Sequence, residues 1–349
     1  MKKNYVIPIF IPHAGCPFSC VFCSQRGITG LSAPVPPHEI GPIVACYLKT
    51  IPPRGAHVEL GFFGGSFTGI PMALQSDYLS QAMPFIQAGR LHDIRLSTRP
   101  DYIDVPILKN LKKHRVGCIE LGIQSMSDDV LRASGRGHSS SDSKKASKMI
   151  LNYGFRLGHQ MMLGLPKSTF EKEIKTARLS VKLGAKQVRI YPTVVLKNSA
   201  LFDMYKKGRY IPISEQEAIR RSAVLLKYFA GHGVRVIRCG LHPSDGLANR
   251  ELVAGPYHPA FRQKVETYRI GQIFKQMTKK TGILKSLAGI RYNPSDTAVV
   301  IGHHRTNARM LESMFGKKIL FADKKSIPGH LSLVYKNGKT GRVSLETTA

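Results

Sequence analysis

Short runs of β-branched and aromatic residues alternate with longer amphipathic stretches through most of this chain, and this alternation leaves few folds open. Seven such runs are predicted to be strands: Tyr5–Ile11, His57–Phe63, Ile94–Ser97, Cys118–Ile123, Phe155–Leu163, Gln187–Tyr191 and Val234–Cys239. Helical patterns lie between them, among others at Leu74–Ile86, Ser141–Tyr153, Glu171–Leu183 and Glu215–Phe229. Because strands that alternate with helices form parallel sheets, the sequence predicts an α/β fold with a partial parallel β/α barrel.

Glycine or polar residues follow several of these strands, before the next helix begins. They are Gly64-Gly65-Ser66, Thr98-Arg99, Gln124-Ser125 and Gly164-Leu165-Pro166. In parallel α/β folds the carboxyl ends of the strands hold the active site. We therefore expect a functional site at that edge of the sheet.

Three cysteines cluster in the loop predicted after the first strand, in the segment Cys16-Pro17-Phe18-Ser19-Cys20-Val21-Phe22-Cys23. The chain holds six cysteines in 349 residues, which is too few for a disulfide framework. In a reducing compartment such a cluster is typical of metal binding. The other cysteines, Cys46, Cys118 and Cys239, lie in apolar segments, where a free cysteine usually behaves as a small buried hydrophobe.

Two metal sites fit the cluster. Three thiolates can hold one 4Fe-4S cluster and leave its fourth iron open to another ligand. The alternative is a zinc site, completed by His13 or by a distant ligand. Pro17, Phe18 and Phe22 would shield an iron-sulfur cluster from water.

The cysteine segment resembles that of the radical S-adenosylmethionine (SAM) enzymes, whose signature is Cys-x3-Cys-x2-Cys with an aromatic residue before the last cysteine. Phe22 occupies that position. The resemblance implies that Cys16, Cys20 and Cys23 hold a 4Fe-4S cluster, and that the amino and carboxylate groups of SAM bind the open iron. It implies an enzyme in which one electron cleaves SAM to methionine and a 5′-deoxyadenosyl radical. An electron donor such as flavodoxin or ferredoxin is then a partner.

The same resemblance implies a set of SAM contacts. Gly64, Gly65 and Ser66 stand where the family keeps a Gly-Gly-Glu-like segment that binds the SAM amino group through backbone carbonyls, and Ser66 replaces the usual Glu. Two glycines let a backbone approach a ligand closely, although they are also common in tight turns. The further expected contacts are Arg99, Glu120, Gln124, Ser125 and Arg136.

Each of these further contacts has a structural alternative. Glu120 could be a polar residue in a strand core, but an unpaired carboxylate is rare in a dry interior. A contact with a ligand or with an arginine is therefore expected. Gln124 and Ser125 could cap the helix that follows near Asp128. The arginines could pair with the SAM carboxylate or lie solvated on the surface.

More of the chain resembles the radical domain of the catalytic subunit of Elongator, which modifies the wobble uridine of tRNA. The segments that match in order are Thr98–Asp101, Glu120–Ser125, Arg136–His138, Met161–Pro166 and Arg189–Leu196. The first two cysteines lie closer together here, and no acetyl-CoA-binding Arg-x-x-Gly-x-Gly loop follows Gly255. Uridine carboxymethylation by this chain alone is therefore not expected. The oxygen-independent coproporphyrinogen oxidases share the short spacing, which keeps a small-molecule substrate open.

Charge supplies the last constraint. Lys and Arg number 52 against 22 Asp and Glu, a net charge of +30, and residues 257–349 carry 17 basic against 5 acidic residues. We expect a radical SAM core over 1–255 and a small basic α+β unit over 256–349. Such a surplus attracts phosphates, so tRNA or another RNA is an expected partner. The alternatives are a merely solubilising surface, or a metal-containing protein that binds RNA without chemistry.

Membrane insertion is not expected. Prolines and charges interrupt every apolar run before it reaches the ~18 residues of a membrane span. Pro8 and Pro12 break the N-terminal apolar stretch, which argues against a secretory signal. The sequence therefore predicts a cytoplasmic protein. Its last residues, from Lys336-Asn337-Gly338 onward, are expected to form a hairpin end or a frayed tail.

Overall fold

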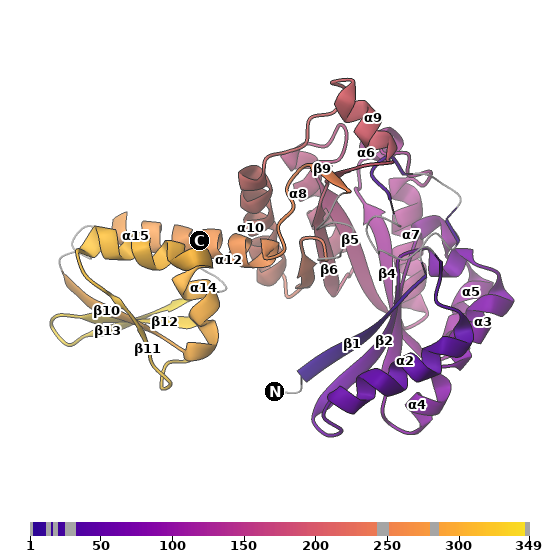
Figure 1. Cartoon of the computed structure of the whole chain (residues 1–349), viewed down its shortest axis with the longest axis horizontal. Coiled ribbons are helices and arrows are strands. Elements are labelled where there is room, and N and C mark those ends of the chain that lie inside the picture. The colour runs from indigo at the N-terminus through magenta and orange to yellow at the C-terminus, as the bar shows by residue number, and fades with distance from the viewer. Residues whose placement is uncertain are drawn as a thin grey trace. The chain divides into compact units, whose positions relative to one another are not determined.

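The computed structural model describes residues 3–11, 15–16, 20–24, 33–242, 251–279 and 286–345. The chain divides into two compact units, residues 1–213 with 242–256 and residues 214–241 with 257–349 (Figure 1). It passes between them after residues 213, 241 and 256, whereas the sequence indicated one boundary after residue 255. In the described part of the chain, every helix is too short or too polar to cross a lipid bilayer.

A curled parallel sheet organises the first unit (Figure 1). Its strands follow the order of the chain: β1 (Lys3–Phe10), β2 (Ala56–Phe63), β3 (Asp93–Thr98), β4 (Val116–Gln124), β5 (Arg156–Leu163) and β6 (Gln187–Pro192). Each pairs in parallel with the next. The last strand in the seven-stranded order is β8 (Arg235–Cys239), whose residues are counted with the second unit. The predicted partial barrel is confirmed.

Crossover helices join these strands: α2 (Pro37–Thr50), α3 (Met72–Ser80), α4 (Met83–Gln87), α5 (Val105–Lys113), α6 (Asp128–Ala133), α7 (Ser140–Asn152), α8 (Phe170–Lys182) and α9 (Ala200–Lys206). Short 3₁₀ turns, η1 (Phe67–Gly69) and η2 (Pro100–Tyr102), and a small antiparallel pair, β7 (Val195–Leu196) with β9 (Leu252–Ala254), complete the unit.

Local signals set the helix boundaries. Ser139 and Asp142 form a reciprocal capping box at the start of α7, which satisfies two backbone N–H groups that the helix cannot pair itself. One prediction is wrong, because the expected helix Leu74–Ile86 is divided into α3 and α4. Pro84 lies in the first turn of α4, and a proline cannot continue a helix from the residues before it because it lacks the N–H.

The core of the first unit lies between the sheet and these helices. Its fully buried side chains come alternately from strands and helices, for example Ile7, Leu60, Leu96, Ile40 and Leu108. Successive side chains of a strand point to opposite faces. Residues that alternate with Leu60 and Leu96 therefore lie on the other face of the sheet, which is free to carry polar groups.

The second unit contains α10 (Glu215–Gly231), α12 (Phe261–Lys279), α14 (Thr297–Ile301), α15 (Thr306–Phe315), the 3₁₀ turns η3 (Pro294–Asp296) and η4 (His303–Arg305), and a four-stranded sheet. The sheet order is β11 (Leu320–Ala322), β10 (Leu287–Tyr292), β12 (His330–Tyr335) and β13 (Thr340–Ser344). The expected α+β unit is confirmed. The expected hairpin end is also found, because Lys336–Gly338 lies in the turn between β12 and β13, with Gly338 at φ +79°.

Candidate functional site

The cysteine loop and the glycine loop after β2 touch through their backbones. A Cβ on Gly15 would collide with the Ser66 carbonyl oxygen, and a Cβ on Gly69 would collide with the carbonyl oxygen of Gly15. Gly15 also has a φ of +68°, which favours glycine. The chain immediately before Cys16 therefore lies against the loop that contains Gly64 and Gly65. Sequence reasoning did not single out Gly15 and Gly69, although glycine beside each motif was the available signal.

The three cysteines of the loop differ in exposure. Cys20 is buried, whereas Cys16 and Cys23 are half-buried. The loop is fixed by hydrogen bonds, since Cys23 N donates to Cys20 O at 2.9 Å and Val21 N donates to Ser134 O at 3.1 Å. His13, Pro17 and Phe18, which the sequence analysis weighed, lie outside the described residues.

The aromatic residue before the last cysteine, Phe22, packs against apolar side chains. Phe22 packs against a cluster of Val130, Met162 and Leu165, and Tyr191 packs against the same cluster. These residues come from α6, β5, the loop after β5 and β6. Phe22 is partly buried, and its contact with the cluster ties the cysteine loop to the carboxyl ends of the later strands, while its shielding role stays a prediction.

Two arginines lie beside the cysteines. The Arg136 guanidinium approaches Cys20 Sγ at 3.3 Å through Nη1 and donates to Gly122 O at 2.7 Å through Nη2. Its Nε is buried and has no hydrogen-bond partner among the described residues. Arg99 Nη2 donates to Arg136 O at 2.6 Å, and Arg99 also forms a two-pronged ion pair with Asp101. Both arginines are buried, so the solvated alternative is wrong for them.

Burial alone would lower the pKa of Arg99, but Asp101 and the nearby Cys16 and Cys20 raise that pKa above its ordinary value. The guanidinium therefore stays charged beside the thiols. Because Arg99 is paired with Asp101 and donates to the Arg136 carbonyl oxygen, it holds the Arg136 loop in place.

Gln124 ends β4 in a strained conformation, with φ at +58°. Backbone strain of this kind clusters at functional sites. A Cβ on Gly122 would stand 3.1 Å from Gln124 Nε2 and 3.5 Å from Arg136 Nη2, so Gly122 lies beneath both side chains. Gln124 Oε1 accepts from Gln160 Nε2 at 3.4 Å. Gln124 and Arg136 are thus brought together at the carboxyl end of β4.

Two of the expected SAM contacts have internal partners. Ser66 Oγ lies 3.0 Å from Thr98 Oγ1 and accepts from Arg99 N at 3.1 Å, so the residue in the place of the family's Glu ties the β2 loop to the β3 loop. Ser125 Oγ accepts from Ser127 N at 3.2 Å, and Ser127 is the residue before α6. Ser125 therefore contacts the residue before that helix and does not cap the helix itself, and its contact with SAM stays a prediction.

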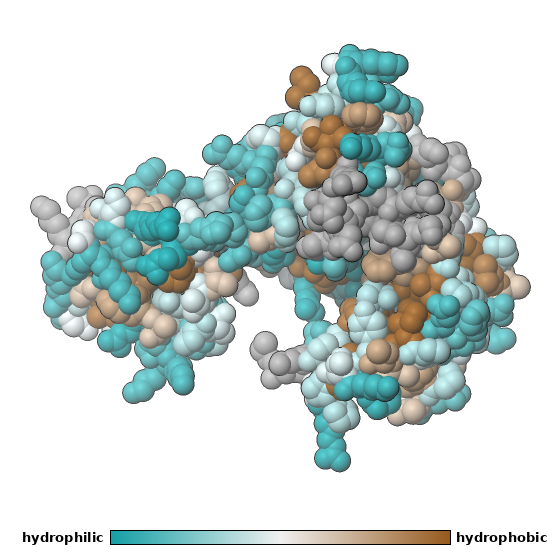
Figure 2. Space-filling view, viewed as in Figure 1, coloured by the Kyte–Doolittle hydropathy of each residue, from teal (hydrophilic) through white to brown (hydrophobic). Residues whose placement is uncertain are grey.

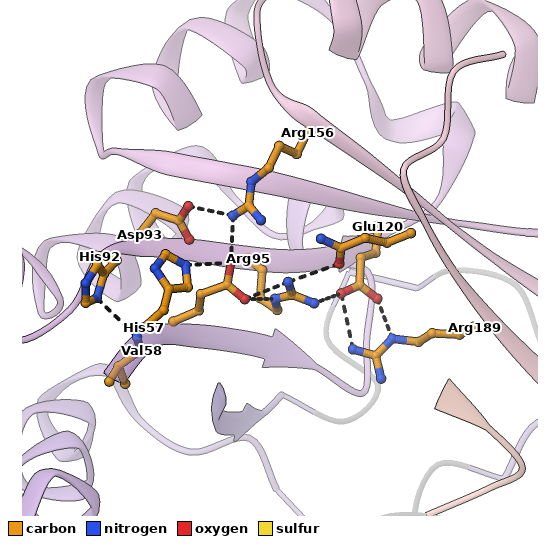
Figure 3. Close-up of polar contacts among 10 residues, drawn as sticks. His57, Val58, His92, Asp93, Arg95, Glu120, Arg156 and Arg189 are labelled. Atoms are coloured by element: carbon orange, nitrogen blue, oxygen red, sulfur yellow. Dashed lines mark hydrogen bonds and ion pairs between the residues drawn. The ribbon is translucent and has the colours of Figure 1, made fainter. Parts of the chain in front are cut away.

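Glu120 lies on the inner face of the sheet and is paired with arginines (Figure 3). Arg95 Nη1 donates to Glu120 Oε1 at 2.8 Å, and Arg189 donates to both carboxylate oxygens. Of the two alternatives for this residue, the structure has the arginine contact. Arg189 also lies over the Phe63 ring, 4.8 Å from its centroid, and Phe63 directly precedes Gly64.

These pairs continue across the sheet as an ion-pair ladder, which consists of Asp93, Arg156, Glu59, Arg95, Glu120 and Arg189 (Figure 3). Arg95 and Arg156 each lie 2.6 Å from a Glu59 oxygen. Burial would raise the pKa of Glu59, but the charges of Arg95 and Arg156 lower it. Burial and the neighbouring Glu59 raise the pKa of Asp93. Sequence reasoning missed the ladder, although charged residues inside apolar strands were its signal.

Within the described residues, His57, Glu59 and Asp93 form the group of three ligand-type side chains whose ligand atoms all lie within 4.8 Å of one another. Arg156 Nη2 contacts both Glu59 and Asp93, so a cation already occupies this place. The group is part of the ladder and does not form a metal centre.

The isolated cysteines differ from one another. Burial raises the pKa of the Cys118 thiol to about 12 and that of Cys239 to about 11, which keeps both thiols protonated and inert. Cys46 is exposed, so its expected burial is wrong. The buried positions of α2 are Ile40, Val44 and Leu48, and Cys46 falls on the opposite side of this helix.

The geometry defines a class before any comparison: a parallel half-barrel that carries three thiols after β1 and a glycine loop after β2, joined at the carboxyl ends of the strands. The family model described as "Radical SAM superfamily" matches residues 10–179, and the Radical_SAM C-terminal domain matches residues 185–269. The chain belongs to the radical SAM superfamily. The enzyme class expected from the sequence is confirmed at the level of this family, whose members bind a 4Fe-4S cluster and SAM.

The similar curated proteins include two kinds, tRNA uridine(34) acetyltransferases and a heme chaperone. A tRNA uridine(34) acetyltransferase of Methanocaldococcus infernus is 25% identical over 254 residues, which cover 61% of this chain and 47% of that protein. The heme chaperone HemW of Bacillus subtilis is 27% identical over 258 residues, 72% of this chain and 65% of that protein. The chain spans between a third and a half of the first three curated relatives it matches, with 47%, 34% and 50% covered.

The fold has a counterpart among solved structures. The archaeal Elp3 of Methanocaldococcus infernus superposes with a TM-score of 0.60 at 19% identity, over 80% of this chain and 64% of that one. At this identity the likeness concerns the fold, and it confirms the half-barrel architecture.

Proposed function

We propose that this chain binds a 4Fe-4S cluster through Cys16, Cys20 and Cys23 and cleaves SAM reductively. The observation that carries the proposal is the contact of the cysteine loop with the glycine loop, through Gly15 and Gly69. It brings three metal-binding thiols to a backbone that can approach a ligand without a Cβ in the way. A cluster and SAM bound there would supply the one-electron chemistry that generates a 5′-deoxyadenosyl radical.

The residues of the chain have separate parts in this proposal. Arg136 offsets the negative charge of a thiolate at Cys20, and its buried Nε is left for a further acceptor. A carboxylate such as that of SAM is a suitable acceptor for a guanidinium. Arg99 donates a hydrogen bond to the carbonyl oxygen of Arg136 and so holds the Arg136 loop. Gly64 has φ at +98°, a backbone conformation that glycine adopts without strain.

The donor set suits a cluster. Three thiolates can hold a 4Fe-4S cluster and leave one iron open to a further ligand, whereas a structural zinc site needs a fourth protein ligand. Zinc stays the alternative that metal analysis has to exclude.

Anaerobic reconstitution tests the enzyme proposal. We expect about four irons per chain, absorption near ~400 nm that dithionite bleaches, and 5′-deoxyadenosine formed from SAM. Flavodoxin or ferredoxin should replace dithionite as the electron donor. A protein that retains zinc and never cleaves SAM contradicts the proposal and supports the alternative of a metal-containing module without chemistry.

We infer tRNA as the substrate class. Two observations support this inference: the relatives named as tRNA uridine(34) acetyltransferases and the net charge of +30. Lysine and arginine side chains bind the phosphates of nucleic acids. Mass spectrometry of tRNA nucleosides tests it, with tRNA incubated with the reconstituted protein, SAM and reductant. A new SAM-dependent nucleoside is expected. The inference is contradicted if tRNA from cells lacking the gene contains the same nucleosides as tRNA from unaltered cells, and if incubation with the reconstituted protein also leaves the tRNA nucleosides unchanged.

A second candidate is a tetrapyrrole-related function. The HemW relative matches 72% of this chain, a larger share than the tRNA uridine(34) acetyltransferase of Methanocaldococcus infernus, which matches 61%. Heme titration of the reconstituted protein separates the candidates. A stoichiometric change in the heme absorption spectrum supports the heme function, and its absence beside a modified tRNA nucleoside supports the first proposal.

A further inference from the structure

The four-stranded sheet of the second unit has one covered face and one open face. Ile290, Leu331 and Leu333 belong to the apolar core that also contains residues of α12, α14 and α15. Figure 1 shows these helices on one side of the sheet. Because side chains alternate along a strand, the residues between the core positions lie on the opposite face.

One row of this open face crosses every strand of the sheet. Phe321 of β11 is paired with Arg291 of β10, Arg291 with Ser332 of β12, and Ser332 with Arg342 of β13. We call these four residues the open-face row. Strands lie ~4.8 Å apart, so the row spans about 14 Å, the length of about four stacked nucleotides of a single strand.

The aromatic end of the row is built as a platform. A Cβ on Gly289 would stand 3.2 Å from Phe321 Cε2, so the ring rests directly on glycine backbone. The Phe321 residue remains 43% exposed, and Lys318 Nζ lies 5.7 Å from the ring centroid. The exposed part of this ring can stack with a nucleobase.

The rest of the row borders a basic hollow. A hollow of about 400 Å³ is lined by Arg291, Arg342 and Lys325, by the hydroxyl residues Ser326, Ser332 and Thr340, and by a single carboxylate, Asp323. The Arg291 side chain is 56% exposed and lies 3.9 Å from Asp323. Hydrophilic residues dominate the viewed surface of this unit in Figure 2, with hydrophobic residues between them. Three cations beside an aromatic platform complement phosphates and bases.

We infer that the open-face row binds a single-stranded segment of RNA, with a base on Phe321 and phosphates on Arg291 and Arg342. Hydroxyl side chains in the hollow are suited to the ribose 2′-OH. The inference deepens the proposed function and rests on RNA as its substrate class. The open-face row lies beyond residue 269, the last residue that either family model matches.

Fluorescence anisotropy of the full chain with a labelled oligouridylate of about ten nucleotides tests the inference. Phe321→Ala should weaken binding about tenfold, since loss of base stacking costs ~1–3 kcal/mol and tenfold is about 1.4 kcal/mol. Phe321→Leu keeps an apolar side chain and should weaken binding as well, because it lacks the ring. Arg291→Ala with Arg342→Ala should lower the salt slope by about 1.4, at ~0.7 per contact.

The helical side of the same unit offers matched controls. Met314 and Arg309 are exposed on α15, so Met314→Ala and Arg309→Ala remove an apolar and a basic side chain away from the row. Both should bind RNA as the unchanged chain does. An affinity of Phe321→Ala and Phe321→Leu equal to that of the unchanged chain overturns the inference.

SAM cleavage measured without substrate in the same preparations separates this inference from the proposed function. If the unchanged chain cleaves SAM and binds RNA while the row variants bind equally well, only the open-face row is wrong. If the unchanged chain cleaves SAM but binds a polyglutamate peptide and no RNA, RNA is wrong as the partner and the surface takes an acidic protein. Loss of SAM cleavage in the unchanged chain contradicts the enzyme proposal instead.

Discussion

The ion-pair ladder and the cysteine site are both polar regions of the same half-barrel, but they are built differently. In the ladder each carboxylate contacts at least one arginine, Glu59 and Glu120 contact two each, and Asp93 Oδ1 is a buried oxygen without a partner among the described residues. Beside the cysteines, buried polar atoms such as Arg136 Nε and His138 Nδ1 have no partner among the described residues, and Gln124 is held at positive φ. Paired buried charges hold a structure together, whereas strain and unpaired buried atoms mark places prepared for a ligand.

His138 illustrates the second kind of environment. It is 5% exposed, and burial together with the Arg136 charge lowers its pKa to about 4. The imidazole is therefore neutral at physiological pH, next to two guanidinium groups. Perturbed groups of this kind are enriched at functional sites, and the comparison with the ladder predicts that changes at the two places affect different properties.

The largest expected effect is at the cysteines. Cys20→Ala should lose the iron and all SAM cleavage, because the cluster then lacks one of its three thiolates. Cys16→Ala and Cys23→Ala should behave in the same way. Iron analysis and 5′-deoxyadenosine formation measure this. Cys118→Ala is the control, since this thiol is buried and protonated, and iron loss in that variant would show that the ligands are assigned wrongly.

Breaking the ladder should change stability instead. Glu120→Ala leaves Arg95 and Arg189 without their shared carboxylate, and removing one partner of a buried ion pair costs about 3–5 kcal/mol. Glu217→Ala, which breaks surface pairs with Arg220 and Arg221, should cost under about 1 kcal/mol. Urea unfolding measures both. An equal loss in the two variants would contradict the structural role of the ladder.

Acid sensitivity gives an intermediate effect. His159 is completely buried, and desolvation lowers its pKa to about 3, so the native imidazole stays neutral while the unfolded one takes a proton below ~6.5. Stability therefore falls as pH drops from about 6.5 toward the folded pKa, by about 1.4 kcal/mol per pH unit. His159→Gln should remove that part of the slope in unfolding experiments.

The smallest expected effect on stability is at Gln124. Gln124→Gly relieves strain of about 1 kcal/mol but adds a backbone entropy cost of about the same size, so the unfolding free energy should change by under about 1 kcal/mol. SAM affinity should fall about tenfold with the loss of one amide contact. Asn198→Gly makes the same backbone change at an exposed residue with φ +59°. Isothermal titration that finds equal SAM affinity in the two variants would contradict a role for Gln124.

Several site residues could be predicted because their signal is local. Cys16, Cys20 and Cys23 stand within eight residues, and Gly64-Gly65 follows a run with clear strand character. The division of Leu74–Ile86 was missed because its apolar pattern continues across Pro84. The exposure of Cys46 was missed because an apolar segment does not state which side of a helix its thiol occupies.

The ladder and the roles of Arg99 and Glu120 could not be predicted, since each depends on partners from other strands. Arg95 reaches Glu59 on one neighbouring strand and Glu120 on the other. A carboxylate inside an apolar strand indicates only that some partner exists. The partner is chosen by strand register, which no short segment contains.

The sequence by itself determined the α/β class, the strand order along the chain, the cysteine motif and the basic surplus, because hydrophobic periodicity, residue spacing and charge are properties of neighbouring residues. The tertiary structure alone decided that Gly15 meets Gly69, that Arg136 reaches Cys20, and that Phe321, Arg291, Ser332 and Arg342 form one row. Those contacts join residues far apart in the chain, and only packing and strand pairing bring them within contact distance.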